Sequence, residues 1–160
     1  MKTTLSPTLA VAGLLSFIAF GQDKSTESNR VRVAEAIHRG EQFAEIKKFS
    51  EALKEYQNAL EVNRQASLAH YRIAEVFILQ NNYQSAANEL REALNGDLQP
   101  KWTEVWSQVN LGKIFDITGQ RERAINAYKQ AERTKDNTQS ALEEAAKYLK
   151  TPYERHKKAE

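Results

Sequence analysis

The three histidines come first in a search for chemistry, because imidazole is a common metal ligand and general base near neutral pH. Glu35 and His38 form a Glu-x-x-His motif, which di-iron helical bundles carry on two helices. No second Glu-x-x-His is present, and neither His70 nor His156 belongs to a His-Glu-x-x-His zinc motif. We therefore interpret Glu35 and His38 as two polar residues on a helix, and expect no metal site.

The sequence motifs that support covalent catalysis or phosphate binding are also absent. The chain has no cysteine, which excludes thiolate zinc sites, disulfides and a Cys nucleophile. It has no Gly-x-Ser-x-Gly elbow and no phosphate-binding glycine loop. Helical repeats and a cap take up most of the chain and leave no room for a catalytic domain. We expect a protein that is not an enzyme and binds no cofactor.

The charges indicate a solvated surface rather than a nucleic-acid interface. Lys and Arg number 23 against 21 Asp and Glu, and 28% of the 160 residues are charged. A nucleic-acid-binding domain usually has a basic stripe, but here the two signs alternate along the chain. The composition is that of one globular unit, for which we expect no nucleic-acid partner.

The N-terminal segment is typical of an export signal. Lys2 is followed by twelve uncharged residues, 9–20, and Ala19 and Gly21 are the small residues that signal peptidase needs. A helix of this length spans about 18 Å, too short for a bilayer core of about 30 Å. We predict a signal peptide over 1–21, cleaved after Gly21, and a periplasmic or secreted protein without a membrane span. An uncleaved N-terminal anchor is the alternative.

Residues 22–30 contain no large apolar side chain and predict a flexible leader. Beyond them, five columns of similar residues recur with offsets of 34 and then 38 residues. One column holds only small residues, Gly40, Ala74 and Gly112, and another holds only large apolar ones, Tyr56, Leu90 and Tyr128. The others are Phe43, Phe77 and Phe115; Ala52, Ala86 and Ala124; and Ala59, Ala93 and Ala131. Four extra residues, 101–104, precede the third copy.

This pattern predicts three pairs of antiparallel helices, over 33–66, 67–100 and 105–138. Small residues allow close contact between paired helices, and we expect the phenylalanines to fill the space between them. Trp102 and Trp106 lie at i, i+4 and are expected to pack the third repeat against its neighbours. Leu142, Ala145, Ala146 and Leu149 form one apolar stripe, which predicts a cap helix over 138–150. Residues 31–150 thus form the domain, with a charged tail over 151–160.

The 34-residue unit resembles the tetratricopeptide repeat, and the resemblance covers residues 33 to about 138. It implies an all-α solenoid of three helix-turn-helix repeats. Arg39 departs from the Leu or Ile that the family prefers, whereas Ile73 and Leu111 fit. The family's early large residue and terminal proline are also absent.

In this family the first helix of each repeat lines a concave, partner-binding groove. On that basis the expected groove residues are His38, Glu41, Glu45, Tyr71, Arg72, Glu75, Ile78, Trp106, Asn110, Lys113 and Asp116. The clamp with which chaperone-tail binders of the family hold a terminal carboxylate is absent, because Ile37, Glu41, Trp106 and Asn110 replace its basic and amide residues.

The resemblance implies a non-catalytic module or scaffold that binds a peptide or partner protein in its groove. The groove is acidic toward the first repeat, so we expect a basic and apolar segment, bound through Tyr71, Arg72 and Glu75. An accessory subunit of an envelope enzyme complex and a self-assembling structural protein are the alternatives.

Overall fold

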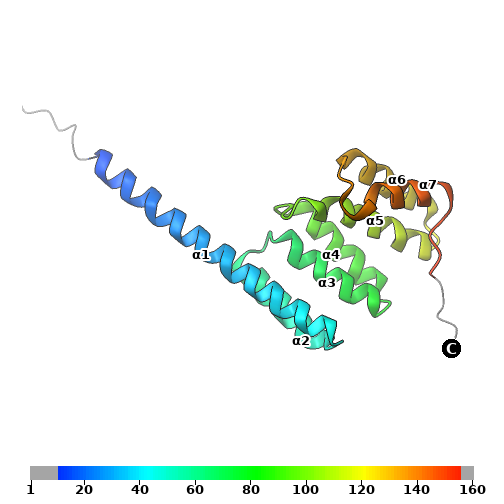
Figure 1. Ribbon diagram of the computed structural model, residues 1–160, viewed down its shortest axis with the longest axis horizontal. Helices are drawn as coiled ribbons and strands as arrows, with labels where there is room; N and C mark the ends of the chain where they lie inside the picture. The colour runs from blue at the N-terminus through cyan, green and yellow to red at the C-terminus, as the bar shows by residue number, and fades with distance from the viewer. Residues whose placement is uncertain (1–10, 156–160) are drawn as a thin grey trace, which may run out of the picture.

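The computed structural model describes residues 11–155, and they form helices joined by short turns (Figure 1). The helices are α1 (Val11–Glu45), α2 (Phe49–Val62), α3 (Ser67–Leu79), α4 (Tyr83–Asn95), α5 (Trp102–Ile117), α6 (Arg121–Thr134), the short 3-10 helix η1 (Thr138–Ser140) and α7 (Ala141–Lys150). α1 packs with α2, α3 with α4 and α5 with α6, and α7 covers α5 and α6. The predicted all-α solenoid of stacked helix pairs is confirmed.

The small and large columns of the repeat meet at the centre of each helix pair. A Cβ atom added to Gly40 would lie 2.3 Å from Cε1 of Tyr56, and one added to Gly112 would lie 2.3 Å from Cε1 of Tyr128. In the second repeat, Ala74 and Leu90 are both fully buried. The close approach of the paired helices therefore depends on a small residue beneath each large one.

The phenylalanine column does not fill this space, contrary to the sequence prediction. Phe43 and Phe77 are only half-buried at the edges of the core, and Phe115 alone is buried. Tyr56 and Tyr128 occupy the centre because their rings lie against glycines, which leaves the Phe column nearer the surface. The alanine columns do lie in the core, and all six side chains are fully buried.

Arg39, which departs from the family pattern, is explained by its place at the outer face of the first repeat. The corresponding Ile73 and Leu111 are buried because an earlier helix pair packs against each. No earlier pair packs on Arg39 in the described chain, and its Nε donates instead to Glu55 on α2 at 2.9 Å. The charge keeps this end of the stack hydrated.

Residues 22–30 lie within α1, so the flexible leader predicted for them is not what the structure shows. A helix that is already nucleated extends at little cost, because each added residue gains one hydrogen bond. The first repeat supplies that nucleus, and no proline interrupts residues 22–45. Residues 11–21 of the predicted signal peptide are also helical, and residues 1–10 lie outside the described residues. None of the described helices is both long and apolar enough to cross a membrane.

The C-terminal cap packs as the apolar stripe predicts. Ala141 and Ala145 are buried, and Leu142 and Leu149 pack against the core of the second and third repeats. The Oδ1 of Asn137 accepts from the backbone N–H of Leu142 in the first turn of this helix, at 2.9 Å.

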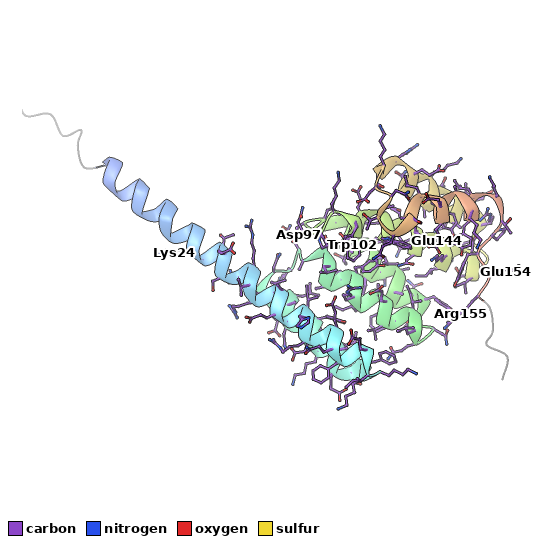
Figure 2. All side chains as sticks on the ribbon, in the orientation of Figure 1. Lys24, Asp97, Trp102, Glu144, Glu154 and Arg155 are labelled. Carbon is purple, nitrogen blue, oxygen red and sulfur yellow. The ribbon has the colours of Figure 1, made fainter. Side chains whose placement is uncertain are left out.

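The tail after α7 is bound to the repeats up to residue 155. The backbone N–H of Tyr153 donates to Asp116 at 2.8 Å, and Arg155 donates to the hydroxyl of Tyr83 at 2.7 Å. Figure 2 shows Arg155 at the end of the stack away from the α1 extension. The rest of the predicted tail, 156–160, lies outside the described residues.

Candidate functional site

A cavity of about 350 Å³ lies where α1, α3 and α5 come together, and we call it the central pocket. Its apolar part is contributed mainly by the ends of α1 and α3, where Ile78 is half-buried and the side chain of Leu79 is 58% exposed. Its polar part comes from the middle of α3 and from α5. The full lining is Ala44, Tyr56, Arg72, Glu75, Val76, Ile78, Leu79 and Asn110.

Arg72 forms two ion pairs beside this pocket. One guanidinium nitrogen lies 2.7 Å from Glu41 on α1, and another lies 2.8 Å from Glu75 on α3. Two carboxylates thus surround one guanidinium, which leaves the group with net negative charge. Because both ends of the guanidinium are engaged, Arg72 does not present an open site for an anionic ligand.

Tyr71 is not a groove side chain, and this expectation from the sequence is wrong. It is only 5% exposed, and its ring packs edge-on against Trp102 with the centroids 5.3 Å apart. Its hydroxyl accepts a hydrogen bond from Asn110 at 3.1 Å. Burial, together with the charge of Glu75, raises the pKa of the Tyr71 hydroxyl. Tyr71 therefore connects α3 to α5 within the core.

Two expected groove residues of the third repeat, Trp106 and Lys113, are bound to the C-terminal segment instead. Trp106 donates from its indole nitrogen to the carbonyl of Thr138 at 3.1 Å. Lys113 lies 2.5 Å from Glu144 on α7 and sits over the rings of Trp106, Tyr148 and Tyr153, 5.5–5.7 Å from their centroids.

The Asp116 side chain is fully buried and accepts hydrogen bonds from three groups. These are the guanidinium of Arg121 at 2.9 Å, the hydroxyl of Tyr128 at 3.0 Å and the backbone N–H of Tyr153 at 2.8 Å. Burial and the hydrogen bond to Asp116 raise the pKa of Tyr128. Asp116 is therefore a structural centre of the third repeat, contrary to the expectation that it faces a ligand.

The two remaining residues of the first repeat lie near the surface. His38 is exposed, with its Nε2 3.2 Å from the amide of Gln42 and its Nδ1 4.0 Å from Glu41. Glu45 is exposed at the end of α1. Of the eleven expected residues, the structure places Arg72, Glu75, Ile78 and Asn110 on the central pocket, with Glu41 bound to Arg72.

Four lining residues of the pocket were not expected from the sequence: Ala44, Tyr56, Val76 and Leu79. Tyr56 belongs to the second helix of its repeat, so a rule that counts only first helices misses it. Burial raises the pKa of Tyr56 to about 12, so its hydroxyl stays protonated at neutral pH. Within the described residues, no group of three His, Asp or Glu side chains is placed to hold a metal ion.

The environment of His70 predicts that the free energy of unfolding depends on pH. Burial lowers the pKa of its imidazole, but hydrogen bonds to Glu89 at 2.7 Å and to the carbonyl of Arg64 outweigh burial and raise the pKa overall. A group whose pKa is raised by folding stabilises the protein below its unfolded pKa of about 6.5. That stability is lost as the pH rises through the higher folded value.

Urea denaturation at pH 6 and pH 8 measures this effect, and His70→Gln should remove the slope that His70 contributes. His38→Gln, at an exposed position, is the matched control. An unchanged pH dependence in His70→Gln would contradict the role of the Glu89 pair.

One relative and two solved structures are similar to this chain. No known family's sequence profile matches the chain. It is 32% identical over 111 residues to the Hsp70-Hsp90 organising protein of Plasmodium falciparum (isolate 3D7), a match that covers 66% of the chain. The chain spans only 20% of the length of that relative.

Two solved structures have a similar fold. One crystal structure of MamA matches with a TM-score of 0.57 and 18% identity, over 80% of each chain. A second MamA structure matches with a TM-score of 0.53 and 15% identity, over 82% of each chain. The MamA structures show the fold, and the relative, together with the three repeats seen in sequence and structure, supports a protein of the tetratricopeptide-repeat family.

Proposed function

We propose that the protein is a non-catalytic interaction module whose central pocket binds a basic and apolar segment of a partner protein. The observation that carries the proposal is the pairing of an apolar cavity with an excess of carboxylates. Leu79 and Ile78 offer apolar surface, while Glu41 and Glu75 surround Arg72 at 2.7 and 2.8 Å. A Lys or Arg of a ligand can pair with the outer face of these carboxylates while a neighbouring apolar side chain enters the pocket.

The similarity to the Hsp70-Hsp90 organising protein supports an interaction role, since that relative's name describes a protein that organises two others. The pocket volume of about 350 Å³ is at the lower end of the range for ligand sites and suits one or two side chains. The two carboxylates also disfavour an acidic ligand or a terminal carboxylate, because like charges would meet in a partly desolvated site.

Charge reversal at the pocket tests this function. Glu75→Lys and Ile78→Glu should each weaken partner binding by about tenfold or more, because one inverts the charge and the other places a carboxylate in the apolar part. Glu92→Lys, an exposed change on the second helix of the same repeat, is the matched control. Affinity capture by the parent and the three variants, quantified by mass spectrometry, measures the difference. Equal capture by all four would move the interface away from the pocket.

We also propose that the protein is exported and that its signal peptide is cleaved after Gly21. The support is the twelve-residue uncharged segment 9–20 and the small residues Ala19 and Gly21. The intact mass of the exported protein should then correspond to a chain that begins at Gln22. Recovery of the uncleaved chain from the membrane fraction would contradict cleavage and support the anchor.

A further inference from the structure

A second cavity, of about 810 Å³, lies at the other end of the first two repeats, and we call it the upper cleft. It is formed by α1, by the turn between α2 and α3, by the start of α3 and by the loop between α4 and α5. Its lining is Thr26, Asn29, Arg30, Val33, Ala34, Ile37, Val62, Asn63, Ala66, Leu68, Asp97, Gln99 and Pro100. Of these lining residues, only Ile37 was matched above to a position of the family's groove. The upper cleft is therefore a surface separate from the central pocket.

One wall of the cleft is the part of α1 that extends beyond its repeat. α2 ends at Val62, whereas the facing helix α1 continues to Val11, and Figure 1 shows it running out from the stack of helix pairs. Arg30, Val33 and Ile37 lie at i, i+3 and i+7 and form one stripe of this wall. The stripe is apolar near the repeat and becomes polar and cationic farther out. From 26 to 37 it is about 17 Å long, or three helical turns.

The other wall is the connection over 96–101, which is longer than the connection over 63–66 between the first two repeats. Asp97 fixes it. Its Oδ1 accepts from the backbone N–H groups of Ser67 and Gln99 at 3.2 and 3.0 Å, and its Oδ2 accepts from Asn63 at 3.2 Å. Its own N–H donates to the carbonyl of Gln65 at 2.8 Å. The wall is therefore rigid before anything binds.

The floor and rim of the cleft differ in chemistry. Val33, Val62 and Leu68 are partly exposed and present apolar surface to the cavity. Asp97 keeps its negative charge, but both of its carboxylate oxygens already accept hydrogen bonds within the wall, from Asn63 and from the backbone N–H of Ser67. Arg30 pairs with Glu27 at 3.7 Å between two highly exposed side chains, and such a pair contributes little. The cleft can thus offer apolar contact along its floor and one cation at its outer end.

We infer that the upper cleft binds a short amphipathic helix of a partner protein, with an apolar face on Val33 and Leu68 and a carboxylate beside Arg30. Two departures from the repeat, the extended α1 and the longer connection after α4, converge on this one cleft. A regular repeat needs neither of them to stack. Arg30 favours a carboxylate at the outer end of the cleft, whereas the central pocket favours a cation, so the two surfaces select different segments.

The probe is a fluorescein-labelled twelve-residue peptide of Leu, Ala and Glu, with its leucines on one helical face. Fluorescence anisotropy with the full chain should give saturable binding. Val33→Glu and Arg30→Glu should each weaken peptide binding about tenfold or more. Val33→Glu places a carboxylate against the apolar face of the peptide, and Arg30→Glu places one beside its glutamates. The same peptide with Lys in place of Glu should bind the parent about tenfold more weakly.

Two variants serve as matched controls. Val31→Glu changes a side chain that is 47% exposed and does not line the cleft, and it should leave binding unchanged. Ile78→Glu alters the central pocket and should also leave binding unchanged, so failure of one site does not count against the other. Four results would each overturn the inference. They are the absence of saturable binding, an equal loss of binding in Val31→Glu and Val33→Glu, a loss of binding in Ile78→Glu, and tighter binding of the Lys peptide than of the Glu peptide.

Discussion

Leu90→Ala is expected to lower the free energy of unfolding by about 2–5 kcal/mol. Leu90 is fully buried between α3 and α4 and belongs to the core cluster that joins the second and third repeats. Removing three carbon atoms there loses their burial and leaves a cavity, because Ala74 and Ala86 beside it in the core cannot fill the space. Urea denaturation followed by circular dichroism measures the change.

Leu79→Ala is the matched control for this substitution. It removes the same atoms from a side chain that is 58% exposed, so we expect a change within about 0.5 kcal/mol. If Leu90→Ala and Leu79→Ala had similar stabilities, the large column would not lie at the centre of the repeat and the register of the helix pairs would be wrong.

Asp116→Ala is expected to destabilise the protein by about 3 kcal/mol, because it leaves partners of a buried carboxylate without an acceptor. The carboxylate is fully buried, while Arg121 is about one-third exposed, so water offsets part of the loss. The tail should also detach, since the backbone N–H of Tyr153 donates to Asp116. Urea denaturation gives the free energy, and hydrogen exchange at the Tyr153 amide reports the tail.

Glu122→Ala, an exposed change six residues along the chain, is the control and should have little effect on either measurement. Full protection of the Tyr153 amide in Asp116→Ala would show that α7 and the tail are held without this carboxylate.

The stacking of the repeats could be predicted because it depends on residue size at a fixed period. Gly40 and Gly112 mark the close contacts, and the structure places Tyr56 and Tyr128 against them, while Ala74 and Leu90 are buried in the same core cluster. Which aromatic column lies at the centre could not be predicted. A phenylalanine on the first helix of a repeat and a tyrosine on the second have similar apolar area, and only the direction of each side chain decides between them.

The candidate site was predicted in part. Glu41, Arg72 and Glu75 were expected from the family resemblance, in which first helices line the groove, and they do lie together. Tyr71 and Asp116 were misplaced because their partners are far along the chain. Tyr71 meets Asn110 across 39 residues and Asp116 meets Tyr153 across 37, and no local pattern encodes such pairs. Asn63, Ser67 and Asp97 were missed for the same reason.

Photo-crosslinking from the central pocket tests most directly whether this pocket binds a partner protein. p-Benzoylphenylalanine is placed at position 78 in the full chain, with position 92 as the control, and adducts are formed in cells that produce the protein. Adducts are expected at 78 and not at 92, and mass spectrometry should map them to a segment of another protein that combines Lys or Arg with apolar residues. Adducts confined to 92, or an acidic segment captured at 78, would contradict the proposed function.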